Sequence, residues 1–129
     1  MDKENVDALI VLTSGKQDRG TRATLAFSWA CTSLAMGKST ALYLTMDGTM
    51  WAHKNAVEGV QVQGFEPLAE YLEQFLGLEG RLMVCAPCSE YYCSYNRELM
   101  DTVLIPGVEL VGLSTVVSLI QPATNVVTF

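Results

Sequence analysis

The stretch ALIVLTSGKQDRGTRATLAFSWACTSLAMGKSTALYLT, residues 8–45, sets a pattern that the rest of the chain repeats. An apolar run over Ala8–Leu12 is followed by a polar loop, a helix-like segment over Thr21–Met36 and a second apolar run over Thr40–Thr45. Short runs that are apolar throughout are typical of strands buried on both faces of a sheet. Apolar residues recur at helical spacing within the middle segment, and Gly37 follows it as a stop signal. The stretch therefore predicts a strand–helix–strand unit.

The remainder of the chain continues this alternation. A short helical piece is expected to about Val57, and Gly59–Phe65 is expected to be either a short strand or an irregular connector. The other expected elements are helices over Pro67–Leu76, Ser89–Met100 and Ser114–Ile120 and strands over Arg81–Cys85, Val108–Val111 and Asn125–Phe129. Alternation at this spacing predicts βαβ units. We therefore expect a flavodoxin-like, doubly wound α/β fold, with a five-stranded, mainly parallel sheet and helices on both faces, in one domain over residues 1–129.

Length, composition and charge restrict the class of protein. With 129 residues, 50% hydrophobic and 17% charged, the chain can bury a sizeable core. Its apolar excess fits either an oligomer interface or strands buried on both faces. The net charge of −6 and the scattered Lys and Arg residues disfavour nucleic acid as a partner. The polar start Met1–Asn5 and the short apolar runs predict neither a signal peptide nor a membrane span, so a cytoplasmic location is expected.

Three of the four cysteines, Cys85, Cys88 and Cys93, lie in the segment VCAPCSEYYC. A predicted strand ends there and a predicted helix follows, which places thiols near free backbone N–H groups and a positive dipole end. Both favour the thiolate, which is the reactive form of cysteine. In a reducing compartment such clusters serve catalysis or metal binding more often than structural bridges. Cys31, which lies among small and aromatic residues, is predicted to be a core residue.

Four chemistries fit the Cys85-x-x-Cys88 spacing: persulfide carriage, disulfide exchange, metal ligation and plain packing at a crowded junction. Tetrahedral zinc needs four ligands, and only Cys93 and His53 remain as plausible partners, so no metal is expected and no organic cofactor is required. A thioredoxin-type exchanger carries its pair after an early strand, whereas this pair follows a late one. The pattern therefore favours a thiol that carries sulfur, and disulfide exchange and a structural role stay open.

Other polar positions are weaker candidates. His53, the only histidine, follows the second strand, and it or Lys54 could help to hold a thiolate or persulfide anion. A surface or capping role is the alternative for His53. Cys93 is either a resolving or second carrier thiol or a packed helix residue. The Gly15–Gly20 loop lacks both phosphate-binding signatures, so a nucleotide site is not expected, and Asp18 is predicted to cap the helix that follows.

The chain as a whole resembles the DsrE/DsrF-like family of small sulfur-relay proteins, which includes the TusD-like subunits. The resemblance rests on the opening LIVLTSGKQDRGTRATLAFSWACTSLAMGKSTALYLTMDG, the cysteine segment VCAPCSEYYC, and the closing segments LIPGVELVGLSTVV and ATNVVTF. It implies a flavodoxin-like fold and assembly as a homo- or hetero-oligomer, often a trimer or hexamer, and for this chain a homotrimer or homohexamer is expected. It also implies a cysteine that accepts sulfane sulfur as a persulfide and passes it to a partner thiol, such as that of a TusA-like carrier.

The resemblance also suggests roles for individual residues. Family members often have a glycine eight residues after the reactive cysteine, and Cys93 stands in that position, which places the reactive cysteine on Cys85. Cys88 is then an additional thiol. The Asp47-Gly48 turn belongs to the same pattern and is, with His53 and Cys93, a possible auxiliary site.

The sequence thus predicts a cysteine-dependent sulfur relay or sulfurtransferase-like protein. Cys85 would attack a donor persulfide, and Cys88 would resolve the persulfide or carry sulfur itself. The alternatives are a noncatalytic oligomeric binding or redox-sensing module of the same fold and a thiol–disulfide oxidoreductase.

Overall fold

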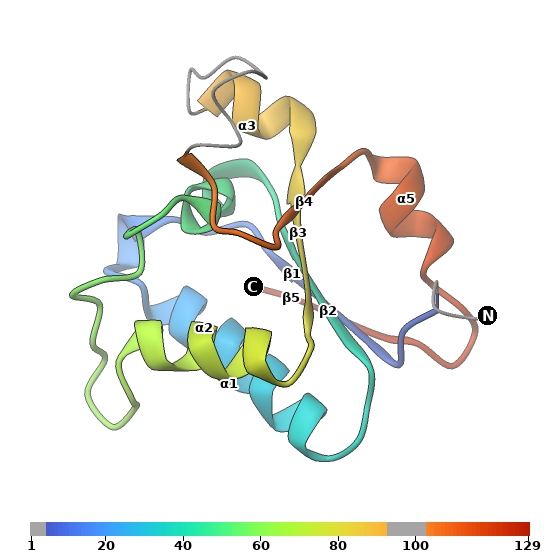
Figure 1. Ribbon diagram of the computed structural model, residues 1–129, viewed down its shortest axis with the longest axis horizontal. Helices are drawn as coiled ribbons and strands as arrows, with labels where there is room; N and C mark the ends of the chain where they lie inside the picture. The colour runs from blue at the N-terminus through green and yellow to red at the C-terminus, as the bar shows by residue number, and fades with distance from the viewer. Residues whose placement is uncertain (1–4, 93–102) are drawn as a thin grey trace.

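The structure is a computed structural model that describes residues 5–92 and 103–129 (Figure 1). Its centre is a five-stranded sheet in which every pair of neighbouring strands is parallel, in the order β4-β3-β2-β1-β5. The strands are β1 (Ala8–Leu12), β2 (Thr40–Leu44), β3 (Arg81–Cys85), β4 (Glu109–Val111) and β5 (Asn125–Thr128). The helices are α1 (Thr21–Ala35), α2 (Leu68–Gly77), α3 (Ala86–Tyr92) and α5 (Leu113–Ser118), with 3-10 helices η2 (Lys16–Asp18) and η3 (Met46–Ala52).

The strand order confirms the predicted doubly wound α/β fold. Strands β1 to β4 follow one another across the sheet, and the chain then returns so that β5 pairs with the free side of β1. The last strand therefore occupies the edge beside β1, where flavodoxin, with its order 2-1-3-4-5, has its second strand. Since all strands are parallel, their carboxyl ends and the loops that follow lie along one edge of the sheet.

The two faces of the sheet carry different layers (Figure 1). Helices α1 and α2 pack side by side against one face, where Phe27 and Phe75 meet edge to face with ring centroids 6.3 Å apart. The opposite face packs against α5 through Val116 and Leu119. Successive strand residues point to alternate faces, so the two cores draw on the same strands, and nearly continuous apolar strands result.

The element boundaries mostly match those expected from the sequence, with two informative differences. Gly59–Phe65 forms turns and irregular backbone, which is the connector alternative. Gly59 and Gly64 adopt φ values of 82° and 91°, which a strand does not contain. The second difference is that α3 begins at Ala86 rather than at Ser89, which bears directly on the cysteines. The end of that helix, expected at Met100, lies outside the described residues.

The capping role expected of Asp18 is confirmed. Its carboxylate accepts hydrogen bonds from the backbone N–H groups of Gly20, Thr21 and Arg22 at 3.0–3.2 Å, which closes the start of α1.

Candidate functional site

The two cysteines of the Cys-x-x-Cys pair lie at the carboxyl end of β3, directly beside the carboxyl end of β2. Cys85 is the last residue of β3, and α3 begins at the next residue. The early start is compatible with Pro87, because a proline in the first helical turn lacks an N–H that would find no partner within the helix. Cys88 is therefore in the first turn, and its backbone N–H donates to the Cys85 sulfur over 3.4 Å. Both cysteines are free thiols, each only 8% exposed.

The sulfur of Cys88 is held by the segment that follows β2. The backbone N–H of Met46 donates to Cys88 Sγ over 3.3 Å, and Thr45 Oγ1 lies 3.5 Å from the same sulfur. Neighbouring parallel strands bring these residues together although they are more than forty positions apart in the chain. The Thr45–Met46 turn thus supplies a main-chain donor and a hydroxyl to one thiol.

The backbone that presents this donor is held in an unusual conformation. Met46 has φ 53°, a left-handed value that costs a residue with a side chain roughly 1–2 kcal/mol. Gly48 fixes the turn: its N–H donates to Thr45 O at 2.9 Å and lies 3.2 Å from Thr13 O. A Cβ at Gly48 would lie 2.2 Å from the Leu12 carbonyl oxygen, so only glycine fits. The Asp47-Gly48 turn therefore helps to hold the Met46 N–H in position to donate to Cys88.

The environment of Cys88 favours the thiolate. Burial acts to raise the pKa of this thiol, but hydrogen bonding by Cys85, Thr45, the Met46 backbone N–H and Thr49 outweighs burial, and the pKa is lowered. Donors that point at a sulfur stabilise its anion more than its neutral form. The thiol of Cys88 is consequently more nucleophilic near neutral pH than an ordinary buried thiol.

The prediction that Cys31 is a core residue is confirmed. It is 6% exposed in the core beneath α1, and its thiol donates to the backbone oxygen of Tyr71 over 3.2 Å. Burial raises the pKa of Cys31 to about 11, which keeps the thiol protonated.

Buried hydroxyl groups beside the thiols are a feature that the sequence analysis missed. Tyr43 is 3% exposed, Thr49 is fully buried and so is Ser89, and within residues 5–92 and 103–129 none of the three hydroxyls has a hydrogen-bond partner of ordinary geometry. Burial, together with the neighbouring Cys85 thiol, raises the pKa of Tyr43 to about 12. Tyr43 pairs in register with Met83, two residues before Cys85, so both point to the same face. The register is a property of the paired strands, so no local signal in the sequence pointed to Tyr43.

The auxiliary candidates Asp47, Gly48 and His53 lie in or directly after η3, the segment that follows β2. The carboxylate of Asp47 accepts a hydrogen bond from the Gln17 side chain. His53 ends η3 and forms a β-bridge with Leu104, and burial lowers the pKa of its imidazole. The backbone N–H of Lys54 donates to Val103 O. The proposed help of His53 and Lys54 to a sulfur anion stays a prediction, and Cys93 lies outside the described residues.

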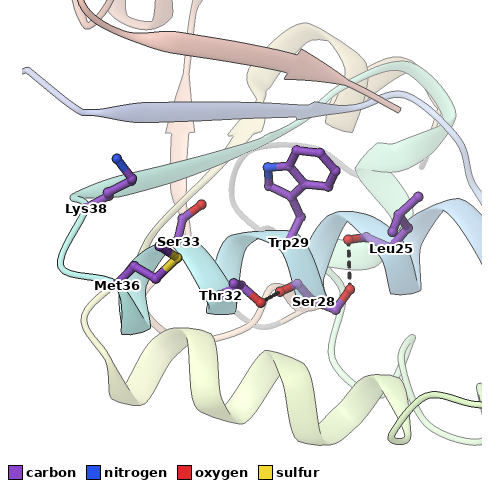
Figure 2. Close-up of a pocket in the computed structure, with 7 residues that line it drawn as sticks. All are labelled: Leu25, Ser28, Trp29, Thr32, Ser33, Met36 and Lys38. Carbon is purple, nitrogen blue, oxygen red and sulfur yellow. Dashed lines mark hydrogen bonds between the residues drawn. The ribbon is translucent and has the colours of Figure 1, made fainter.

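A separate apolar hollow of about 410 Å³ runs along α1, away from the end of β3 (Figure 2). Trp29 rises from this helix toward the sheet and packs edge-on against Phe129, with ring centroids 5.7 Å apart. Across the described part of the chain, no three His, Cys, Asp or Glu side chains gather as metal ligands would. None of the helices it contains is both long enough and apolar enough to cross a membrane.

The fold and the thiol pair define a class: a parallel α/β protein with two cysteines at the strand end next to a donor-rich turn. Residues 7–129 match the model of the DsrE/DsrF-like family, and the chain belongs to that family, which is associated with sulfur relay. The resemblance stated from the sequence is thereby confirmed.

Solved structures agree on the fold. The ychN protein from E. coli superposes with a TM-score of 0.70 at 18% identity, covering 95% of this chain and 98% of that one. BT1422 from Bacteroides thetaiotaomicron, a conserved protein of unknown function, has a TM-score of 0.58 at 15% identity and covers 95% of both chains. No curated protein sequence matches the chain significantly.

Proposed function

We propose that this protein is a persulfide relay: the Cys85–Cys88 pair receives a sulfane sulfur and passes it to the thiol of a partner protein, for which a TusA-like carrier is the expected type. The observation that carries the proposal is the setting of Cys88 Sγ, which accepts from Met46 N–H and lies 3.5 Å from the Thr45 hydroxyl; both contacts favour a thiolate at a buried position. Membership of a sulfur-relay family supports the same function. A cytoplasmic location belongs to the proposal.

The chemistry needs no external oxidant or reductant. A cysteine thiolate attacks the outer sulfur of a donor persulfide R–S–SH; a new S–S bond to cysteine forms, the donor S–S bond breaks, and R–S⁻ leaves. The transferred sulfur keeps its proton as Cys–S–SH. In the second half, a partner thiolate attacks that outer sulfur and the cysteine leaves as thiolate. A lowered thiol pKa serves this second step, because a more acidic thiol is the better leaving group.

The proposal is tested by treating the purified protein with inorganic polysulfide and measuring its intact mass. We expect the wild type and the core variant Cys31→Ser to gain one sulfur atom, and the double variant Cys85→Ser/Cys88→Ser to gain none. Circular dichroism and the melting temperature of each variant confirm that it is folded. A wild type whose mass does not change at all after the treatment contradicts the relay and leaves a noncatalytic binding module.

A thiol–disulfide oxidoreductase is the second candidate, and one contact favours it. The hydrogen bond from Cys88 N–H to Cys85 Sγ brings the two sulfurs of a Cys-x-x-Cys pair together across one helical turn. In the same mass experiment this function would appear as the loss of two hydrogen atoms, with no gain of sulfur.

We also propose that the protein forms a homo-oligomer, as a trimer or hexamer. Large apolar side chains remain uncovered on α5, just after it and on the edge strand β5: Leu113, Val117, Ile120 and Val126 are 67%, 61%, 40% and 47% exposed. Apolar surface of this kind favours self-association. Light scattering is expected to give the mass of three or six chains, and Val117→Lys/Val126→Lys is expected to lower it. A monomeric wild type would contradict the proposal.

A further inference from the structure

Two buried hydroxyls beside the thiols have no hydrogen-bond acceptor among the residues that the structure describes. Tyr43 Oη and Thr49 Oγ1 lie in residues that are 3% and 0% exposed, and neither finds a partner of ordinary geometry in the described parts of the chain. A buried polar group without a partner destabilises the folded protein. Phenylalanine at position 43 and valine at position 49 would fill the same space without a buried hydroxyl. The two hydroxyls therefore indicate a ligand that accepts their hydrogen bonds.

Both hydroxyls lie against the thiol pair, from different elements. Tyr43 projects from β2 on the face that carries Cys85, and its hydroxyl lies near Cys85 and Thr45 without a well-formed hydrogen bond to either. Thr49 belongs to η3, and its hydroxyl lies near Cys88 in the same way. Because Cys88 N–H donates to Cys85 Sγ, the two sulfurs are neighbours. The two hydroxyls therefore approach the neighbouring sulfurs from two different elements.

The two thiols are not equivalent. Cys88 Sγ accepts from Met46 N–H and lies within hydrogen-bond distance of the Thr45 hydroxyl, both from outside its own helix. Cys85 Sγ accepts from the first turn of α3, as a helix-capping side chain does. The polar contacts from outside α3 thus lie on Cys88. The family resemblance had instead indicated Cys85 as the reactive cysteine.

We propose that Cys88 is the thiol that accepts sulfur and that the hydroxyls of Tyr43 and Thr49 bind the outer sulfur of the Cys88 persulfide. This inference rests on the proposed relay function and adds to it the identity of the acceptor and of its binding groups. The Cys88 thiolate attacks the outer sulfur of R–S–SH, the new Sγ–S bond forms as the donor S–S bond breaks, and R–S⁻ leaves. The outer sulfur, as –SH or after loss of its proton as –S⁻, accepts hydrogen bonds from the two hydroxyls. Donors already in place where negative charge develops stabilise that charge without rearrangement.

The experiment compares Thr49→Val and Tyr43→Phe with the matched control Thr24→Val. Thr24 is 1% exposed, its hydroxyl likewise finds no partner within the described residues, and it lies on α1 rather than on the elements that carry the thiols and their neighbouring hydroxyls. Each protein is loaded with limiting polysulfide, freed of excess reagent, and followed by intact mass over time. We expect Thr49→Val and Tyr43→Phe each to hold persulfide about tenfold less, a change worth about 1.4 kcal/mol. Thr24→Val is expected to match the wild type.

Thermal unfolding gives a readout that separates binding from structure. Replacing an unsatisfied buried hydroxyl by an apolar group of the same shape is close to neutral or stabilising. We therefore expect Thr49→Val and Tyr43→Phe to lose persulfide while their melting temperatures stay equal to or above that of the wild type. A purely structural role would instead lower the melting temperature together with loading.

Single-cysteine variants decide which thiol accepts sulfur. Cys85→Ser is expected to load and Cys88→Ser is not. Loading of Cys88→Ser with none in Cys85→Ser would overturn the assignment to Cys88, and wild-type retention in both Thr49→Val and Tyr43→Phe would overturn the hydroxyl site. A wild type that gains no sulfur would refute the relay function itself and this inference with it.

Discussion

Cys31 and Cys88 are two thiols with almost the same burial and opposite chemistry. They are 6% and 8% exposed. Cys31 acts as a donor to the Tyr71 carbonyl and has its pKa raised to about 11 by burial. Cys88 accepts from Met46 N–H, and its pKa is lowered despite burial. Burial alone raises the pKa of Cys31, whereas at Cys88 hydrogen bonding to the sulfur outweighs burial, so the groups around a buried cysteine decide whether it can act as a nucleophile.

The largest effect expected from this contrast is in thiol alkylation. The pKa of Cys88 lies below the usual 9.0 and that of Cys31 at about 11, and each pKa unit is a factor of ten in thiolate below both values. At pH 7 we expect iodoacetamide to modify Cys88 at least about 100-fold faster than Cys31. Peptide fragmentation after digestion separates Cys88 from Cys85. Equal alkylation rates at Cys31 and Cys88 would contradict the difference in pKa between the two thiols.

The next largest effect is expected at the glycine behind the donor turn. In Gly48→Ala the new Cβ would lie 2.2 Å from Leu12 O, so η3 must shift and the protein should lose roughly 1–3 kcal/mol of stability. The shift should also move Met46 N–H and slow Cys88 alkylation. Urea unfolding measures the first effect. Gly112→Ala is the control, because a Cβ there meets nothing within 4 Å; an equal loss in Gly112→Ala would show that the close approach does not matter.

A smaller change isolates one donor. Thr45→Val removes the hydroxyl that lies 3.5 Å from Cys88 Sγ and leaves Met46 N–H in place. We expect the pKa of Cys88 to rise, because one of the groups that lower it is removed; the pH dependence of alkylation measures the change. Thr40→Val, at the other end of β2, where the Thr40 hydroxyl donates to Lys38 O, is the control. An unchanged pKa in Thr45→Val would assign the effect to the remaining donors.

The smallest expected effect concerns His53, where burial lowers the imidazole pKa, as it raises the pKa of the Cys31 thiol. The unfolded chain, with a histidine pKa near 6.5, then binds the proton before the folded protein does as pH falls. The contribution of neutral His53 to stability is therefore fully present above about 6.5 and is lost as pH falls toward the folded pKa. Urea midpoints between neutral and mildly acidic pH should fall less steeply in His53→Gln. An identical slope would refute the assignment.

Much of the fold could be predicted because it depends on local patterns. Ala8–Leu12 and Arg81–Cys85 are apolar runs of strand length, and both appear with those bounds. Thr21–Met36 has helical spacing and a glycine after it, and α1 ends one residue earlier. The sequence predicts a helix from Ser89, whereas α3 begins three residues earlier, because Pro87 is compatible with a first helical turn. That difference puts Cys88 within the first turn and so within reach of β2.

The residues of the site also divide into those that local sequence patterns could identify and those that depend on the tertiary structure. The thiols were identifiable from their spacing and from the strand that precedes them, and the buried state of Cys31 followed from its neighbours. Thr45, Met46, Thr49 and Tyr43 carried no local signal, because their importance depends on the pairing of β2 with β3. The roles of Cys93 and His53 toward sulfur stay predictions.

By itself, the order of apolar runs and helical segments determined a parallel α/β layer with cysteines at a strand end, because those features follow from side-chain periodicity along the chain. Only the tertiary structure decided which sulfur receives donors. A hydrogen bond depends on position in space, and the groups that meet Cys88 come from a neighbouring strand and a left-handed turn more than thirty-five residues away.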